Sequence, residues 1–264
     1  MDRYNDDDIV LLLTATVTPQ FSYMAHKAEE RLRQYIVAID WYLHHTPYKI
    51  VIGENSGCYD LLDNFDKQFA DRMELVCYQE TNSTRNYGYN EMTILQKCHE
   101  QSRFLRGASL IAKITGRNIV KNINLILSQI RSPRGNFFAA ETGLKIQYIN
   151  ARCFFFTSGM WDKVIALKGG VGAISYKEIR EGKIPPPGIY VDVETAYGSL
   201  IRKELRKDRK AFRLLHYPID ISGVSGYYGT TIDMGLGTKI VQYMKSMIKS
   251  ILFEIKIRRK MFFD

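Results

Sequence analysis

The chain has 264 residues, of which 45% are hydrophobic and 25% are charged, with 17 tyrosines and 13 phenylalanines. This composition is that of a folded protein with a full core, and it excludes global disorder. The net charge of +9 belongs to the C-terminal third. Residues 202–213 and residues 239–264 each hold seven basic and two acidic side chains, so we expect an anionic partner near that end.

Cysteine usage and the N-terminus indicate the compartment. The cysteines show no CxxC spacing and no Cys/His pattern of a metal site, which favours reduced and mostly buried thiols. The first eight residues are acidic and do not resemble a signal peptide. The longest apolar run is far shorter than the ~20 residues that a membrane-spanning helix needs. We therefore expect a cytoplasmic protein.

Strand-type and helix-type segments alternate along the first 235 residues. Residues 9–17 form a continuous apolar run rich in branched side chains, which is typical of a strand buried on both faces. Further strands are expected at 48–57, 73–78, 109–115, 137–148 and 153–157, and helices at about 22–44, 61–69, 90–104, 118–131, 158–167 and 190–206. This order predicts one α/β domain over residues 1–235, with a mainly parallel sheet and a ligand site at the carboxyl ends of its strands.

The tail, residues 236–264, has a different pattern. Apolar side chains recur at helical spacing and lysines occupy the opposite face, which predicts an amphipathic helix over 239–260. The apolar positions are Ile240, Met244, Met247, Ile248, Ile251 and Ile255. Such a helix is typical of binding in the plane of an anionic membrane surface. The charge alone would also suit a nucleic acid, but the isoleucine-rich face favours lipid, and we expect no nucleic-acid partner.

The segment Ser109–Asn118 is the strongest candidate for a phosphate site. It begins as a buried strand and ends in hydrogen-bond donors beside a glycine, namely Lys113, Thr115, Gly116, Arg117 and Asn118. Gly116 would let a ligand approach the backbone, and the Arg117 guanidinium suits a diphosphate. The alternative is an ordinary strand–helix connection with surface charges.

Two other segments carry side chains suited to a nucleotide. Thr14 and Thr16 end the first strand, and Glu54 and Asn55 end the second, where a carboxylate could hold a ribose diol. Turn chemistry alone would also explain the second group. In the segment 85–91, Arg85, Gly88 and Glu91 could surround a phosphate or sugar. The alternative there is a helix start with Asn90 as its N-cap.

Candidate catalytic and acceptor residues lie later in the chain. Asp192 and Glu194 stand near a helix start, and either could be the general base that a hydroxyl acceptor needs, with Glu194 slightly favoured. The segment 216–229 is rich in glycine and tyrosine and is expected to be a loop that covers the donor or meets the acceptor. Its polar candidates are His216, Asp220, Ser222 and Ser225.

The chain lacks a Walker A sequence, a G-x-G-x-x-G after the first strand and a G-x-S-x-G. It resembles GT-A-type nucleotide-sugar glycosyltransferases of bacterial surface-polysaccharide (capsule or O-antigen, lipopolysaccharide) biosynthesis. Three features carry the resemblance: the strand ending Thr14-Ala-Thr16, the Gly88…Glu91 helix start, and Ala112-Lys-Ile-Thr-Gly-Arg-Asn118. It implies an enzyme on the inner face of the membrane that transfers a sugar from a nucleoside diphosphate, with UDP as the expected carrier, to a hydroxyl of a lipid-linked or growing glycan.

The chain departs from that family at its metal site. GT-A enzymes carry an Asp-x-Asp that binds Mn²⁺ or Mg²⁺, whereas residues 109–118 contain no acid. The nearest substitutes are Asp192-Val-Glu194 and Asp60-Leu-Leu-Asp63. The sequence therefore leaves binding of a divalent cation as one alternative. In the other, Lys113 and Arg117 neutralise the diphosphate in place of a metal. Two alternatives to a glycosyltransferase are a sugar-1-phosphate nucleotidyltransferase and a non-catalytic nucleotide-sugar-binding module recruited to the membrane.

Overall fold

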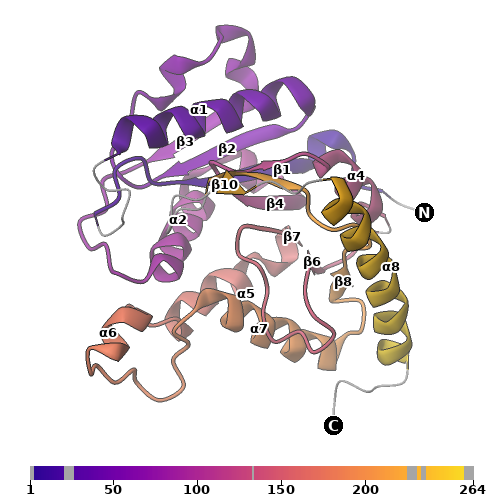
Figure 1. Cartoon of the computed structure of the whole chain (residues 1–264). Coiled ribbons are helices and arrows are strands. Elements are labelled where there is room, and N and C mark those ends of the chain that lie inside the picture. Colours follow the sequence, from indigo (N-terminus) through magenta and orange to yellow (C-terminus); the bar gives the residue numbers. More distant parts are fainter. Residues whose placement is uncertain (1–2, 21–26, 133, 225–230, 233–235, 259–264) are drawn as a thin grey trace.

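A computed structural model describes residues 3–20, 27–132, 134–224, 231–232 and 236–258. Its main sheet has seven strands in the order β3-β2-β1-β4-β7-β6-β8 (Figure 1). The strands of this sheet are β1 (Ile9–Ala15), β2 (Lys49–Glu54), β3 (Met73–Cys77), β4 (Leu110–Thr115), β6 (Phe138–Ala140), β7 (Cys153–Thr157) and β8 (Phe212–Leu214). Only β7 runs against its neighbours, so the prediction of an α/β fold with a mainly parallel sheet is confirmed.

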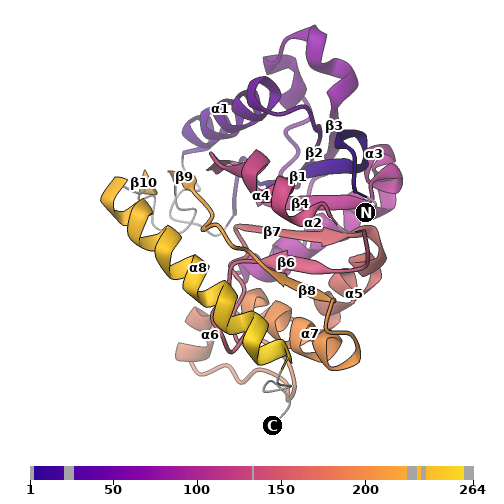
Figure 2. The same cartoon turned by 90° about the vertical axis from the view of Figure 1, so that its right-hand side faces the viewer.

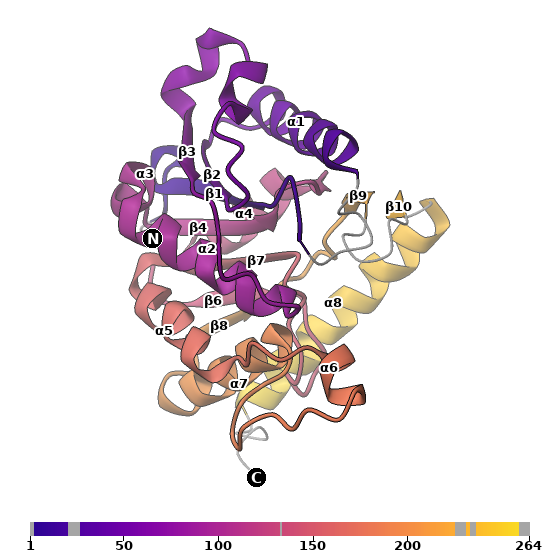
Figure 3. The ribbon, with the colours of Figure 1, turned by 90° about the vertical axis from the view of Figure 1, so that its left-hand side faces the viewer.

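Helices cover both faces of this sheet. The helices are α1 (Ala28–His45), α2 (Tyr87–Gln101), α3 (Arg103–Gly107), α4 (Ile123–Ile130), α5 (Trp161–Ala166), α6 (Tyr176–Arg180), α7 (Val193–Lys207) and α8 (Leu236–Arg258). One apolar core joins the sheet to α1 and α4, and the other joins it to α2, α5 and α7 (Figures 1 and 3). All seven residues of β1 are buried, as expected for a strand covered on both sides.

The carboxyl end of β4 continues into a second, small sheet. β5 (Ile119–Val120) pairs with β9 (Ile221–Val224), and β9 pairs with β10 (Thr231–Ile232). The segment expected as a long covering loop therefore contains a strand, β9, that pairs with β5. β5 and β10 have two residues each and β9 has four, which leaves too little periodicity to be read from sequence.

Several helix boundaries differ from the sequence prediction. α2 begins at Tyr87 and not at Asn90, because Asn86 is its N-cap and accepts a hydrogen bond from the Tyr89 amide at 3.1 Å. The helix expected near 61–69 is two short 3₁₀ turns, Leu61–Asn64 and Lys67–Arg72. The strand expected over 137–148 is only β6, since the chain turns away after Ala140.

Candidate functional site

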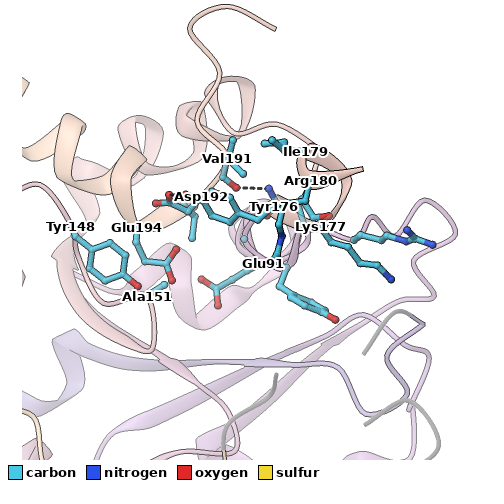
Figure 4. Close-up of a pocket in the computed structure, with 16 residues that line it drawn as sticks. Glu91, Tyr148, Ala151, Tyr176, Lys177, Ile179, Arg180, Val191, Asp192 and Glu194 are labelled. Atoms are coloured by element: carbon cyan, nitrogen blue, oxygen red, sulfur yellow. Dashed lines mark hydrogen bonds between the residues drawn. The ribbon is translucent and has the colours of Figure 1, made fainter. Parts of the chain in front are cut away.

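Two adjoining pockets lie on one side of the molecule, around the N-terminal end of α2. The first, here called the strand-end pocket, has a volume of about 270 Å³ and lies at the carboxyl ends of β1, β2 and β4. The second, here called the α2–α7 pocket, has a volume of about 1040 Å³ and lies between α2, α6 and the start of α7 (Figure 4). Ligands of parallel α/β sheets bind where the strands end, so the first pocket stands where a nucleotide is expected.

The strand-end pocket is lined by hydroxyl, amide and guanidinium groups. Thr14, Thr16, Asn55, Glu91, Thr115 and Arg117 were expected as site residues from the sequence, and all six line it. Arg31, Tyr35, Tyr87, Asn90 and Arg152 line it as well and were missed. Arg31 and Tyr35 lie four residues apart on the buried face of α1, which was a usable signal, whereas Arg152 follows a loop with no motif.

The arginines of the strand-end pocket differ in how they are held. Arg31 is buried, and its Nε donates to the carbonyl oxygens of Thr16 at 3.0 Å and Val17 at 3.2 Å, which fixes the loop after β1. Arg117 Nε donates to Val224 O at 2.8 Å, and its Nη1 lies 3.4 Å from the Tyr35 hydroxyl. These bonds orient the guanidinium and leave further N–H donors for an anion.

Lys113 does not line either pocket, which corrects the expectation that it neutralises a diphosphate. Its side chain is fully buried, its Nζ lies 2.5 Å from Glu91 Oε2, and it donates to Ala151 O at 2.6 Å. Side chains alternate between the two faces along a strand. The sequence showed a cation near the end of β4, but it could not show that the Lys113 side chain lies on a face that is buried in the core.

Glu54, Gly116 and Asn118 also have structural roles in place of the expected ligand contacts. Glu54 is fully buried and accepts hydrogen bonds from the amides of Val17 at 3.0 Å and Cys58 at 2.9 Å. A Cβ on Gly116 would lie 2.9 Å from Thr14 O, so this glycine permits β1, and not a ligand, to approach. Asn118 is buried, and its carbonyl accepts from Tyr42.

The α2–α7 pocket collects acidic and tyrosine side chains. Of the expected residues, Arg85, Gly88, Glu91, Asp192 and Glu194 line it. Tyr148 and Tyr176, which the sequence analysis did not single out, line it too. The carboxylates of Glu91 and Glu194 point toward one another, with the Tyr148 ring beside Glu194 (Figure 4).

Asp192 and Glu194 occupy different environments. Asp192 is the N-cap of α7, and its oxygens accept from the Thr195 amide and the Tyr176 hydroxyl, each at 2.6 Å. Burial raises the pKa of Glu194, and the charges of Glu91 and Asp192 raise it further. A carboxylate with a raised pKa in a pocket is suited to general-base chemistry, which makes Glu194 the better candidate of the two.

Arg85 and the segment 172–191 form the rim of the α2–α7 pocket. Arg85 lies 3.6 Å from Glu181 in an exposed ion pair. Asn86 Nδ2 donates to the carbonyl oxygens of Gly172 at 2.8 Å, Ile174 at 3.1 Å and Val191 at 2.6 Å. One amide therefore ties both ends of the α6 segment to the start of α2.

None of the expected acceptor residues that the structure describes lines either of these two pockets. His216 is exposed, and its backbone amide donates to the Gln129 side chain. Ser222 lies in β9 opposite Ile119. Asp220 is buried beside Asn122, to whose Oδ1 its amide donates at 3.0 Å, and Ser225 lies outside the described residues. Ser222 is instead committed to strand pairing with β5.

The acids present do not fit a divalent cation held as an Asp-x-Asp holds it. Both oxygens of Asp192 are taken by the capping amide and the Tyr176 hydroxyl. Asp60 and Asp63 lie in and beside a 3₁₀ turn, and neither lines a pocket. Within the described part of the chain, no group of three or more His, Cys, Asp or Glu side chains has the geometry to hold a metal ion.

No protein-family model and no curated protein matches this chain. Some solved structures are similar to this chain at low identity. One from Desulfovibrio desulfuricans G20, described as a nucleotide-diphospho-sugar transferase, is 12% identical over 79% of each chain with a TM-score of 0.43. A cytidylyltransferase from Leptospira borgpetersenii is 11% identical over 96% of this chain and 94% of its own, with a TM-score of 0.41.

The glycosyltransferase GlyE from Streptococcus pneumoniae is 13% identical, and the alignment covers 79% of this chain and 45% of GlyE, with a TM-score of 0.43. This chain therefore spans about half of the GlyE chain. Since identity to all three proteins is this low, the function has to be inferred from the chain's own residues.

Proposed function

We propose that this protein transfers a glycosyl unit from a nucleoside diphosphate sugar, with uridine as the base, to a hydroxyl of a glycan or lipid-linked glycan. One observation carries the proposal: a guanidinium-lined pocket at the strand ends adjoins a larger pocket that holds carboxylates and tyrosines. The first suits a nucleoside diphosphate, and the second suits a sugar acceptor together with the base that activates it. This arrangement supports a GT-A-type transferase.

The residues divide between the two substrates. Arg117 and Arg152 would meet the diphosphate, and Asn55 with the threonines of β1 would meet the nucleoside. Glu194 would accept the proton of the acceptor hydroxyl. The acceptor oxygen forms a bond to the anomeric carbon, while the bond from that carbon to the diphosphate oxygen breaks and its electron pair leaves with the nucleoside diphosphate.

The proposal is tested first by ligand binding and then by turnover. A thermal-shift panel of nucleoside diphosphates and nucleotide sugars, with and without Mg²⁺ or Mn²⁺, should raise the unfolding midpoint most for uridine compounds. Release of nucleoside diphosphate that depends on an added glycan acceptor would then establish transfer. Pyrophosphate release from a sugar 1-phosphate and a nucleoside triphosphate would identify a nucleotidyltransferase instead, and tight binding without turnover would identify a binding module.

We further propose that α8 binds the anionic inner face of the cell membrane, where a lipid-linked acceptor would be found. α8 runs diagonally along one side of the molecule (Figure 2). It buries the small, polar Ser246 and Ser250 together with Phe253, whose ring centroid lies 5.5 Å from that of Phe212. Its large apolar side chains are exposed: Ile240, Val241, Met244, Met247, Ile248, Ile251, Leu252 and Ile255. This is the reverse of an ordinary surface helix.

Charge supports lipid as the partner of this apolar face. Lys245 is exposed on α8, and Phe212, which contacts Phe253, belongs to the segment 202–213 with its seven basic side chains. An apolar stripe bordered by lysines and arginines is the pattern of a helix that lies in an anionic interface. No described helix is both long and apolar enough to cross a bilayer.

Vesicle sedimentation tests this part of the proposal. Vesicles with anionic lipid should bind the full chain, purely zwitterionic vesicles should bind it weakly, and Met244→Glu with Ile248→Glu and Ile251→Glu should abolish binding. The opposite result, no binding to anionic vesicles together with a concentration-dependent dimer that these substitutions dissociate, would show that a second copy covers the face. Salt-sensitive RNA binding in place of vesicle binding would also overturn the proposal.

A further inference from the structure

The two pockets share part of their lining. Tyr87 and Glu91 are the residues that line both, and they lie one turn apart at the start of α2. A group that leaves a donor in the strand-end pocket and joins an acceptor in the α2–α7 pocket has to pass this shared wall. Of its two residues, Glu91 carries the charge.

The Glu91 carboxylate is held rigidly through one oxygen. Its Oε2 lies 2.5 Å from Lys113 Nζ, and Lys113 is fixed in turn by Ala151 O and by the Phe154 ring, whose centroid lies 5.5 Å from Nζ. A side chain anchored in this way keeps its position without help from a ligand, which is what preorganised electrostatic stabilisation requires.

The other oxygen of Glu91 has no hydrogen-bond partner among the described residues, although it is buried. A buried polar atom left unpaired costs about 1–3 kcal/mol, so the fold alone does not account for it. The side chain as a whole is 16% exposed and lines both pockets. A ligand group at the junction would supply the missing partner.

We propose that Glu91 is a catalytic residue that contacts the transferred sugar and stabilises the positive charge that develops at its anomeric carbon. The inference rests on the proposed function and assigns a role within that site. Glu91 forms no bond in the step: the acceptor oxygen bonds to the anomeric carbon, the diphosphate leaves with the electron pair, and the proton goes to Glu194. The attraction between the negative carboxylate and the sugar is strongest in the transition state, where the positive charge on the anomeric carbon is greatest.

The competing explanation is that Glu91 serves only as the counterion of Lys113. Removing one member of a buried ion pair is strongly destabilising, whereas removing both charges together often is not. Glu91→Gln alone would therefore confuse catalysis with folding. The double variant Glu91→Gln, Lys113→Met separates the two, because it removes the buried lysine charge as well.

The experiment measures kcat, donor KM and nucleoside diphosphate affinity for the single variant Glu91→Gln and for the double variant, with Glu100→Gln as the matched control. Glu100 lies on the same helix, is exposed and lines neither pocket. We expect the double variant to fold, to bind nucleoside diphosphate within about threefold of the wild type, and to lose about 100-fold or more in kcat, the size seen when one charge-stabilising group is removed. Glu100→Gln should behave as the wild type.

Two results would overturn the inference. Recovery of kcat in the double variant would show that Glu91 only balances Lys113, and an effect confined to donor KM would show ground-state binding alone. Either result leaves the transferase proposal standing, because the wild type would still turn over. A wild type that binds no nucleotide and releases none would instead remove the proposed function, and this inference with it.

Discussion

Arg117→Ala tests whether the strand-end pocket binds the diphosphate. The guanidinium is oriented by the hydrogen bond from Nε to Val224 O at 2.8 Å and lines the pocket. A hydrogen bond between a charged donor and a phosphate contributes about 1.5–3 kcal/mol, so its loss should lower kcat/KM by about 10- to 150-fold. Arg117→Lys keeps the charge but loses the planar guanidinium, so its kcat/KM should lie between those of the wild type and Arg117→Ala.

The same substitution should leave the fold intact. The bond to Val224 O is worth about 1 kcal/mol, against a total stability of about 5–15 kcal/mol. For a chain of this size that corresponds to a fall of about 2–4 °C in the unfolding midpoint. Arg106→Ala, at an exposed arginine of α3, is the control for loss of a surface charge.

The assay is acceptor-dependent release of nucleoside diphosphate, with a direct titration of nucleoside diphosphate on each variant. The reasoning predicts that affinity for the nucleoside diphosphate falls along with kcat/KM. An Arg117→Ala protein that binds and turns over within twofold of the wild type would refute it, as would an equal loss in Arg106→Ala.

Three further predictions concern single residues. Because burial raises the pKa of Glu194 and a base acts only when ionised, kcat/KM should rise with pH through a limb above the usual glutamate range, and Glu194→Gln should remove that limb. Burial pushes the pKa of Glu74 up, but hydrogen bonds from Ser102 and from two backbone amides outweigh it and leave the pKa lowered. Its stabilising effect is therefore present above the unfolded-state pKa and lost as pH falls through the folded-state pKa, so Glu74→Gln should cost about 1–3 kcal/mol in urea unfolding at pH 7 and little in strong acid. A Cβ at Gly53 would overlap the Ile94 side chain and lie 2.5 Å from Cys98 Sγ, so Gly53→Ala should destabilise by about 1–3 kcal/mol, and an unchanged urea midpoint would contradict this.

Much of the fold could be predicted because it depends on local patterns. The bounds of β7, Cys153–Thr157, match the expected strand, and β1, β3 and β4 lie within a residue or two of theirs. The aromatic and branched runs of these strands carry their own signal. The start of α2 was displaced by three residues because the capping side chain is Asn86, and Asn90 looked equally suitable.

The site was harder to predict because it depends on partners far apart in the sequence. Lys113 appeared to belong to the phosphate site, and only the fold shows that Glu91 neutralises it. The periodicity of α8 predicted an apolar stripe on one face, and those side chains are exposed, but it did not predict which residues pack against the body. Ser246 and Ser250 form the packing face, and no helical pattern distinguishes a small polar seam from a solvated one.

The tie made by Asn86 suggests how the lining of the α2–α7 pocket could change. The segment between Ile174 and Val191 supplies Ser175, Tyr176, Lys177, Ile179 and Arg180 to one wall of the α2–α7 pocket. Both of its ends are held by the same amide. This segment can therefore be exchanged or redesigned as one unit. α2, the strand-end pocket and the carboxylates of Glu91 and Glu194 lie outside it and would keep their positions.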